Sequence, residues 1–266
     1  MSKNVVLITG CSSGVGRSLC EQMKSEGYIV VASARNMASI SNINADMLLE
    51  IDVTKEITIS KAIEQIMNRY SRIDILVNNA GYSVRSAIEE IQISELQQLF
   101  DVNVNGIIRM IQAVAPIMRA QGKGRIINIG SVSGKLTTGI NGGYCASKHA
   151  VEPISEAARY ELKPYGIQVT VLEPGAMDTN FFKTLSINSD ERMNNSASPY
   201  SSFYQKDLNF RKIQKRADIE KSVKYICKII RKKHLKVRYT ISLPIIFKIL
   251  IRLPDGIREK LMLRLS

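Results

Sequence analysis

The stretch Val5-Val6-Leu7-Ile8-Thr9-Gly10-Cys11-Ser12-Ser13-Gly14-Val15-Gly16-Arg17 decides the fold, because it joins an apolar run to a glycine-rich turn and then to a helical pattern. The apolar run predicts a strand that is buried on both faces. Glycines in the turn allow backbone angles that other residues resist, and they let the main chain approach a pyrophosphate at the N-terminus of the next helix. The spacing Gly-x-x-x-Gly-x-Gly behind a first strand therefore predicts a dinucleotide-binding turn.

Short apolar runs alternate with longer helical patterns along the rest of the chain. Strands are expected at residues 5–9, 29–34, 47–51, 73–78, 125–129, 169–173 and 239–242. Helices are expected through residue 26 and over residues 55–70, 94–121, 144–163 and 219–232. Strands rich in Val, Ile and Leu, each followed by a crossover helix, are typical of a parallel sheet. We therefore predict a single Rossmann-type doubly wound α/β domain, with a mostly parallel seven-stranded sheet, helices on both faces and a ligand at the carboxyl ends of the strands.

The chain of 266 residues has no Pro-, Gly- or Ser-rich linker, so one domain over residues 1–266 is expected. Within it, residues 1–175 are interpreted as a cofactor-binding and catalytic core, 176–215 as a substrate lid and 233–266 as a basic, apolar tail. The lid is predicted because the alternation gives way there to a long Asn- and Ser-rich stretch that contains a few aromatic residues.

The start of the chain and its cysteines bear on location. The first four residues run directly into the first strand, which predicts no signal peptide and a cytoplasmic protein. The four cysteines, Cys11, Cys20, Cys145 and Cys227, lie too far apart for a metal knuckle or a redox pair. Neither a disulfide nor a metal site is expected.

The net charge of +13 is concentrated towards the C-terminus, where Lys and Arg are dense between residues 211 and 264. No interleaved aromatic set of the kind that stacks on nucleic acid accompanies them, so no nucleic-acid partner is expected. The apolar run 241–254 is too short and too interrupted to cross a bilayer. We expect it to close the substrate cleft or to pack on a sister subunit, and the alternative is an interfacial helix on anionic lipid.

Further motifs follow the later strands: Asp52-Val53 after the third, Asn78-Asn79-Ala80-Gly81 after the fourth, and Pro174-Gly175 with Thr179 after the sixth. With the glycine turn, they resemble the motifs of the short-chain dehydrogenase/reductase family. The amino-acid sequence around Tyr144 is similar to that of the hydroxysteroid and retinol dehydrogenases of this family. The resemblance spans about residues 5–179 and implies a nicotinamide cofactor, hydride transfer and a homodimer or homotetramer. The implied cofactor-binding residues are Gly10, Ser12, Ser13, Gly14, Val15, Gly16, Asp52, Val53, Asn79, Ala80, Gly81, Tyr144, Lys148, Pro174, Gly175 and Thr179.

Arg35, at the end of the second expected strand, bears on the choice of cofactor. An acidic residue in that region would hold the ribose 2′-hydroxyl of NAD, whereas a guanidinium can grip a 2′-phosphate with charge-assisted hydrogen bonds. Arg17, on the first turn of the first helix, can add a second positive group. The sequence therefore predicts that Arg35 selects NADP over NAD.

Tyr144 and Lys148 are four residues apart on an expected helix, so they project from the same face. A phenol beside a substrate carbonyl can donate a proton, and a neighbouring ammonium is expected to lower its pKa towards the working range. The resemblance adds Ser131, which would bond the substrate oxygen, and Asn103, which would hold a water linked to the lysine. Ser133 and Asn105 are the weaker alternatives for these two positions.

The expected lid bears on the substrate. The apolar residues of the expected lid, Phe181, Phe182, Leu185 and Met193, suit a hydrophobic steroid-, retinoid- or acyl-like carbonyl or alcohol. The alternative function is a catalytically silent protein that senses NADP(H). Pro153 falls inside the helix of Tyr144 and can kink it one turn beyond Lys148.

Overall fold

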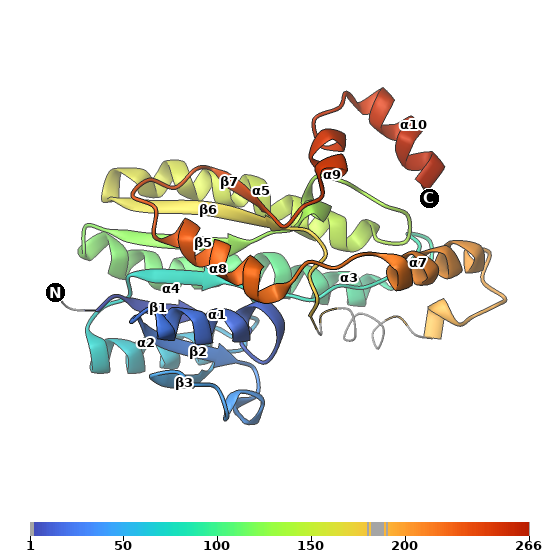
Figure 1. The fold of residues 1–266 in the computed structure, drawn as a ribbon. Helices are drawn as coiled ribbons and strands as arrows, with labels where there is room; N and C mark the ends of the chain where they lie inside the picture. The colour runs from blue at the N-terminus through green and yellow to red at the C-terminus, as the bar shows by residue number, and fades with distance from the viewer. Residues whose placement is uncertain (1–2, 180, 182–188, 190, 266) are drawn as a thin grey trace.

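The computed structural model of the protein describes residues 3–179, 181, 189 and 191–265. Within them, a seven-stranded sheet has the order β3-β2-β1-β4-β5-β6-β7, and each neighbouring pair is parallel (Figure 1). The strands are β1 Val5–Ile8, β2 Ile29–Ala34, β3 Met47–Glu50, β4 Ile75–Asn78, β5 Gly124–Ile129, β6 Ile167–Pro174 and β7 Arg238–Ile241. The predicted doubly wound α/β fold is confirmed, and the sheet is parallel throughout.

Helices cover both faces of this sheet. One face carries α1 (Gly14–Ser25) and α8 (Ile219–Ile230), and the other carries α2 (Glu56–Tyr70), α4 (Gly106–Ala120) and α5 (Gly142–Leu162). Alternate strand residues enter different cores, since Val6 packs in the α1/α8 cluster and Leu7 in the α2/α4/α5 cluster. Both faces of the central strands are therefore rich in apolar residues.

The predicted helix over residues 94–121 is divided. It consists of α3 (Ile93–Phe100), a π-helical turn (Asp101–Asn105) and α4. Single π-turns inside α-helices recur at functional sites because they redirect one side chain. Here the turn carries Asn103, whose side chain is fully buried.

Among the described residues, three further α-helices, which the sequence did not predict with defined bounds, lie at the carboxyl edge of the sheet. They are α7 (Ser201–Ile213), α9 (Ile245–Leu250) and α10 (Asp255–Leu265). α7 occupies part of the expected lid. By contrast, α5 continues across Pro153 without a break. Within the described ranges, no helix is both long and apolar enough to cross a bilayer.

Candidate active site

A cleft of about 2170 Å³ opens at the carboxyl edge of the sheet, where the topology predicts a ligand. The predicted cofactor-binding and catalytic residues line it, apart from Gly16 and Asn103. The loops after β1, β2, β3, β4, β5 and β6 all reach this cleft, because parallel strands end at the same edge.

The glycine turn is clamped to the segment after β4. Asn79 Nδ2 donates to the carbonyl oxygens of Thr9 (2.9 Å) and Gly10 (3.0 Å), while Thr9 Oγ1 accepts from the main-chain nitrogens of Asn79 (3.0 Å) and Ala80 (3.1 Å). A Cβ on Gly10 would lie 2.7 Å from Ala80 Cα, and one on Gly16 would lie 2.4 Å from Asn79 Nδ2. Gly16 is thus a packing residue behind the turn, which explains why it does not line the cleft.

Gly14 begins α1 and faces the other side of the cleft. Its φ of +57° lies in the left-handed region, and a Cβ there would meet the Thr179 side chain at 3.3 Å. Thr179 and the pair Pro174-Gly175 therefore approach the glycine turn from the end of β6. Ser13, the N-cap of α1, makes no side-chain cap bond in the described structure, so the first turn of the helix keeps its N–H groups available.

Arg35 and Arg17 have different surroundings. Arg35 is exposed at the end of β2, lines the cleft and contributes to lowering the pKa of Asp52, although hydrogen bonds from Thr54 contribute more. Arg17 donates to Asn42 Oδ1 at 2.9 Å and is not part of the lining. Only the first of these two arginines fits the sequence-based expectation.

Ser131, Tyr144 and Lys148 converge at the end of β5. Lys148 Nζ donates to the carbonyl oxygen of Ile129, the last residue of β5, at 2.8 Å and lies 6.0 Å from the centroid of the Tyr144 ring. The side chain of Ser131 hydrogen-bonds to Tyr144. Ser131 Oγ also accepts from the main-chain nitrogen of Ser133 at 3.1 Å, which fixes its orientation.

The pKa of the phenol differs from the sequence-based expectation. Burial raises the pKa of Tyr144 to about 12, and the hydrogen bond with Ser131 and the charge of Arg85 only partly oppose this. Burial also lowers the pKa of Lys148 to about 8. The expected depression of the phenol pKa was wrong because the site excludes water from both groups. The tyrosine is therefore a protonated hydrogen-bond donor near neutral pH.

Asn103 lies below the cleft, and its side chain forms hydrogen bonds with the main chain of Tyr82. Its Nδ2 donates to Tyr82 O (2.9 Å) and Ser147 Oγ (3.1 Å), and its Oδ1 accepts from Tyr82 N (3.0 Å). A Cβ on Gly81 would lie 3.0 Å from Asn103 Oδ1 and 3.6 Å from Lys148 Nζ, so the asparagine and the lysine approach the same glycine. Asn105, the alternative, instead donates to Asp101 near the surface.

The sequence pattern of short chain dehydrogenases matches residues 4–190. The chain belongs to this family. Over 181 residues it is 38% identical to the 3-ketodihydrosphingosine reductase of Bacteroides thetaiotaomicron, covering 68% of this chain but slightly less than two thirds, 66%, of the reductase. It is 31% identical to the uncharacterised oxidoreductase YusZ of Bacillus subtilis, covering 95% of this chain and 94% of YusZ. A short-chain dehydrogenase from Streptomyces avermitilis superposes with a TM-score of 0.80 at 29% identity, covering 98% of this chain and 95% of that one.

Structures that share this fold hold both kinds of nicotinamide cofactor. A family member from Burkholderia phymatum is a complex with NAD (TM-score 0.82, 23% identity, 98% and 95% of the two chains), and one from Burkholderia cenocepacia is a complex with NADP (0.76, 22%, 99% and 98%). These identities show the fold alone. The short-chain dehydrogenase described here is thus an oxidoreductase by family, with NAD(P)-binding structural neighbours.

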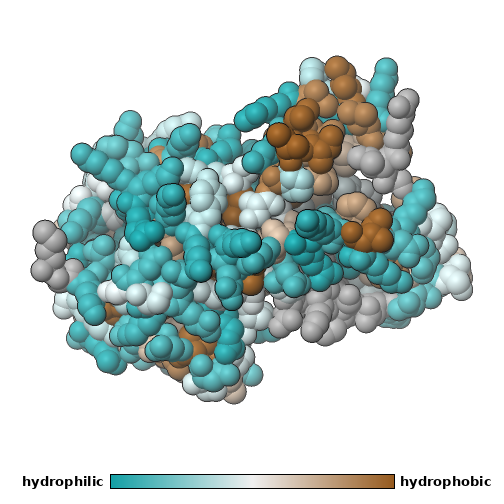
Figure 2. Space-filling model, viewed as in Figure 1, coloured by the Kyte–Doolittle hydropathy of each residue, from teal (hydrophilic) through white to brown (hydrophobic). Residues whose placement is uncertain are grey.

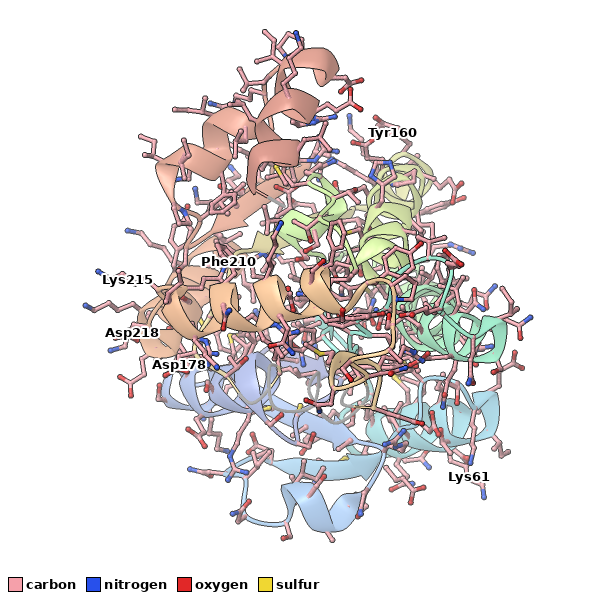
Figure 3. All side chains as sticks on the ribbon, turned by 90° about the vertical axis from the view of Figure 1, so that its right-hand side faces the viewer. Lys61, Tyr160, Asp178, Phe210, Lys215 and Asp218 are labelled. Atoms are coloured by element: carbon pink, nitrogen blue, oxygen red, sulfur yellow. The ribbon has the colours of Figure 1, made fainter. Side chains whose placement is uncertain are left out.

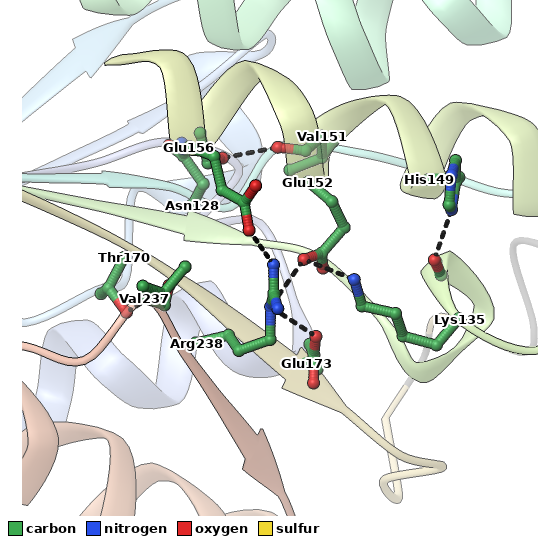
Figure 4. A network of polar contacts seen from close by, with 12 residues as sticks. Asn128, Lys135, His149, Val151, Glu152, Glu156, Thr170, Glu173, Val237 and Arg238 are labelled. Atoms are coloured by element: carbon green, nitrogen blue, oxygen red, sulfur yellow. Dashed lines mark hydrogen bonds and ion pairs between the residues drawn. The ribbon is translucent and has the colours of Figure 1, made fainter. Parts of the chain in front are cut away.

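The dehydrogenase also contains a buried charge network next to this site (Figure 4). Glu152, one turn after Lys148, accepts from Lys135 Nζ at 3.0 Å and from Arg238 Nε at 3.1 Å. Glu173, directly before Pro174, lies 3.6 Å from the same Arg238 nitrogen. Burial, together with the nearby carboxylate of Glu152, raises the pKa of Glu173 to about 7. The network joins α5, β6 and β7 immediately below the site.

We expect Glu173→Gln to stabilise the protein above pH 7. The folded pKa lies above the ordinary 4.5, so the stability that protonated Glu173 contributes is complete below pH 4.5 and is lost as the pH rises through about 7. Glutamine stays neutral, so its free energy of unfolding should exceed that of the wild type by roughly 1–3 kcal/mol at pH 8, and the gap should close towards pH 4.5. Urea denaturation between these pH values measures it.

Glu156→Gln is the matched control, because Glu156 pairs with the same Arg238 but its side chain is 35% exposed. Its effect should stay below about 1 kcal/mol. A lower stability of Glu173→Gln at pH 8 would show instead that the ion pair with Arg238 outweighs the cost of burying the charge.

The walls of the cleft beyond Tyr144 come from late parts of the chain. Phe181 lies 6.0 Å from the Tyr144 ring, centroid to centroid. In Figure 3, α7 crosses the carboxyl edge, with Phe210 and Lys215 near one end. From α9 and α10, apolar residues including Phe247 and Leu263 line the same cleft. The expectation that the tail closes the cleft agrees with this placement.

Of the four apolar residues expected in the lid, Phe181 lines the cleft. Met193 does not line the cleft but is buried against Tyr204 and Ile140, because α7 covers it. Phe182 and Leu185 lie outside the described residues. The sequence also missed Arg85, which lines the cleft near Tyr144 and belongs to no motif.

Proposed function

We propose that this short-chain dehydrogenase is an NADP(H)-dependent oxidoreductase that interconverts a carbonyl and a secondary alcohol on a hydrophobic substrate. One observation carries the proposal: Ser131, Tyr144 and Lys148 converge in the same cleft as a clamped glycine turn. The family model and the oxidoreductases among the relatives support it.

The residues of the cleft fit a dinucleotide. Gly10 and Gly14 leave the main chain open where a Cβ would clash or be strained, and the uncapped first turn of α1 favours the negative charge of a pyrophosphate. Asp52-Val53 and Asn79-Ala80-Gly81 would hold the adenosine side, and Pro174-Gly175 with Thr179 the nicotinamide side. When bound, the cofactor supplies or accepts the hydride.

The chain's own residues would supply the proton and the orientation. In reduction, Tyr144 Oη donates its proton to the carbonyl oxygen while the carbonyl carbon gains the hydride, and solvent later replaces the proton. Ser131 orients that oxygen with a second hydrogen bond. Lys148 balances the phenolate left behind, and Asn103 acts as a positioning residue through Tyr82 and Ser147. Because Tyr144 is protonated at neutral pH, it is in the form that donates a proton in carbonyl reduction.

Arg35 would select NADP(H). It lines the cleft at the end of β2, where the adenosine ribose lies in a doubly wound fold, and it leaves the guanidinium exposed for a 2′-phosphate. We propose NAD as the weaker cofactor.

The substrate would be an apolar ketone or alcohol. Phe181, the two phenylalanines of α7 (Phe203 and Phe210) and the tail provide apolar walls. The Bacteroides relative is by name a reductase of a sphingoid ketone. In this proposal residues 1–175 form the cofactor and catalytic core, 176–215 the substrate lid and 233–266 a tail that completes the cleft. We further propose that the enzyme is a homodimer or homotetramer in the cytoplasm.

The tail supports a second proposal, contact with anionic lipid. Ile245, Ile246 and Ile249 of α9 are 77%, 56% and 51% exposed beside Lys248, and Figure 2 shows an apolar patch over these helices. Co-sedimentation with phosphatidylserine vesicles tests it, and failure to sediment at low salt would overturn it.

A screen of aldehydes, ketones, steroids and acyl thioesters tests the proposed activity, followed by the absorbance of NADPH. Oxidation of NADPH by an apolar ketone is the expected result. Tight NADPH binding with no turnover across the panel would instead favour the silent sensor.

A further inference from the structure

Arg85 stands apart from every motif, yet it lines the same cleft as the proposed proton donor. It follows the Asn79-Ala80-Gly81 segment and lines the same cleft as Tyr144. The two side chains are close enough that the charge of Arg85 lowers the pKa of the Tyr144 phenol, and the phenol in turn raises that of Arg85. A cation therefore lines the same cleft as the group that would protonate a substrate oxygen.

The guanidinium of Arg85 is buried without sufficient hydrogen bonds. Its side chain is only 12% exposed. Its Nε and Nη1 atoms are shielded from solvent and make no hydrogen bond in the part of the chain that the structure describes. Arginine rarely occupies such a position unpaired, because desolvating a cation without acceptors is costly. The burial lowers the pKa of Arg85, as expected for a desolvated cation.

The charged neighbours of Arg85 do not satisfy it. Asp207 Oδ2 of α7 lies 3.7 Å from Arg85 Nε, beyond hydrogen-bonding distance. The same oxygen already accepts from Arg211 Nε at 2.5 Å, and a second nitrogen of Arg211 also contacts it. Arg211 Nη2 further approaches Met193 Sδ at 3.5 Å. One carboxylate thus serves two buried arginines, which leaves a net positive charge at this wall.

We propose that Arg85 is a specificity-determining residue that binds a carboxylate of the substrate. The inference rests on the proposed function, because it names the substrate class of the same site: an amphipathic oxo acid whose carbonyl meets Tyr144 and whose apolar chain extends along the wall formed by Phe181, α7 and the tail. A carboxylate carries the charge opposite to that of the guanidinium and accepts its hydrogen bonds, and it would approach from the cleft that Arg85 lines.

The surroundings strengthen this selectivity. Apolar residues such as Val84, Ile140 and Phe181 line the same cleft as Arg85, and an apolar wall weakens the competition of water for a cation. A neutral head group would leave the buried cation unsatisfied, and a protonated amine would meet like charge, except at the engaged Asp207. The site should therefore discriminate by head group before it discriminates by chain length.

Equilibrium binding separates this inference from catalysis. Calorimetry on the enzyme with NADP⁺ uses decanoate, decanamide and decylamine as probes. Decanoate should bind about 10- to 100-fold more tightly than decanamide. Arg85→Met and Arg85→Gln should remove that preference while NADP⁺ affinity stays unchanged, which also shows that the variants fold.

Arg258→Met is the matched control. Arg258 lines the same cleft from α10 but pairs with Asp255. This variant should retain the preference for decanoate. Equal affinity of the wild type for decanoate and decanamide, tighter binding of decylamine, or an unchanged preference in Arg85→Met would each overturn the inference.

Kinetic assays distinguish a failure of the role proposed for Arg85 from a failure of the proposed oxidoreductase activity. The probes are 4-, 5- and 6-oxodecanoate and their methyl esters, with NADPH as the reductant that supplies the hydride. At least one oxo acid should have a kcat/KM about 10-fold or more above its ester, and Arg85→Met should remove the difference while leaving turnover of the ester. If the enzyme reduces the esters but shows no preference for the acids, the proposed role of Arg85 alone is overturned. If it binds decanoate but reduces none of the probes, the result counts against the proposed oxidoreductase activity.

Discussion

Tyr144→Phe is expected to lower kcat for carbonyl reduction by about 1,000-fold, since a positioned general acid contributes roughly 10²- to 10⁴-fold. The substitution removes one hydroxyl and keeps the ring that packs near Phe181. The affinity for NADPH should change less than about threefold, because the glycine turn and Arg35 are untouched. Steady-state assays and a fluorescence titration of NADPH measure the two quantities.

Tyr160→Phe controls for the loss of a tyrosine hydroxyl from the same helix. Tyr160 is 68% exposed on α5, so this variant should keep wild-type kinetics. If Tyr144→Phe retained a tenth or more of the wild-type kcat, another group would have to donate the proton.

Arg35→Asp is expected to raise the KM for NADPH by about 100-fold and to reverse the cofactor preference towards NADH. Two effects raise the KM for NADPH: the loss of about two charge-assisted hydrogen bonds, and the repulsion between the new carboxylate and the 2′-phosphate. kcat with saturating NADH should remain near that of the wild type, because Arg35 lies at the end of β2, away from Tyr144.

Arg17→Ala provides the comparison for this substitution. Because Arg17 is bonded to Asn42 and does not line the cleft, its removal should alter the KM for NADPH by less than about fivefold. An unchanged ratio of NADPH to NADH efficiency in Arg35→Asp would contradict the assignment of cofactor choice to this residue.

The core of the fold could be predicted because its signals are local. β1 is a continuous apolar run, and β5 is apolar apart from Arg125 and Asn128. Helices such as α2 and α5 begin and end within two residues of the expected bounds. The motifs after β1, β4 and β6 reach one cleft because parallel strands bring their carboxyl ends together. Most of the residues that line the candidate site could therefore be predicted from their positions after the strands.

The elements that the sequence missed depend on tertiary contacts. α7 contains polar and charged residues throughout, and only the pair Tyr204 and Leu208, four residues apart, indicates a buried helical face. The π-turn at Asn103 is stabilised by bonds to Tyr82 and Ser147, which are distant in sequence. No local pattern reports such partners.

Electrostatic properties were the least predictable from residue spacing. The four-residue spacing of Tyr144 and Lys148 correctly placed both side chains in one cleft, but the burial that raises the phenol pKa comes from the surrounding fold. Glu173 and Glu152 are 21 positions apart and meet only because β6 packs beside α5. Arg85 likewise meets Asp207 across 122 positions.

Isotope tracing tests the central claim most directly. The enzyme is incubated with an apolar ketone that it reduces and with NADPH deuterated at both C4 positions, and the alcohol is analysed by mass spectrometry. One deuterium on the carbinol carbon is the predicted result, with the hydroxyl proton coming from solvent. An alcohol without deuterium at that carbon, formed at the full rate, would contradict direct hydride transfer in this cleft.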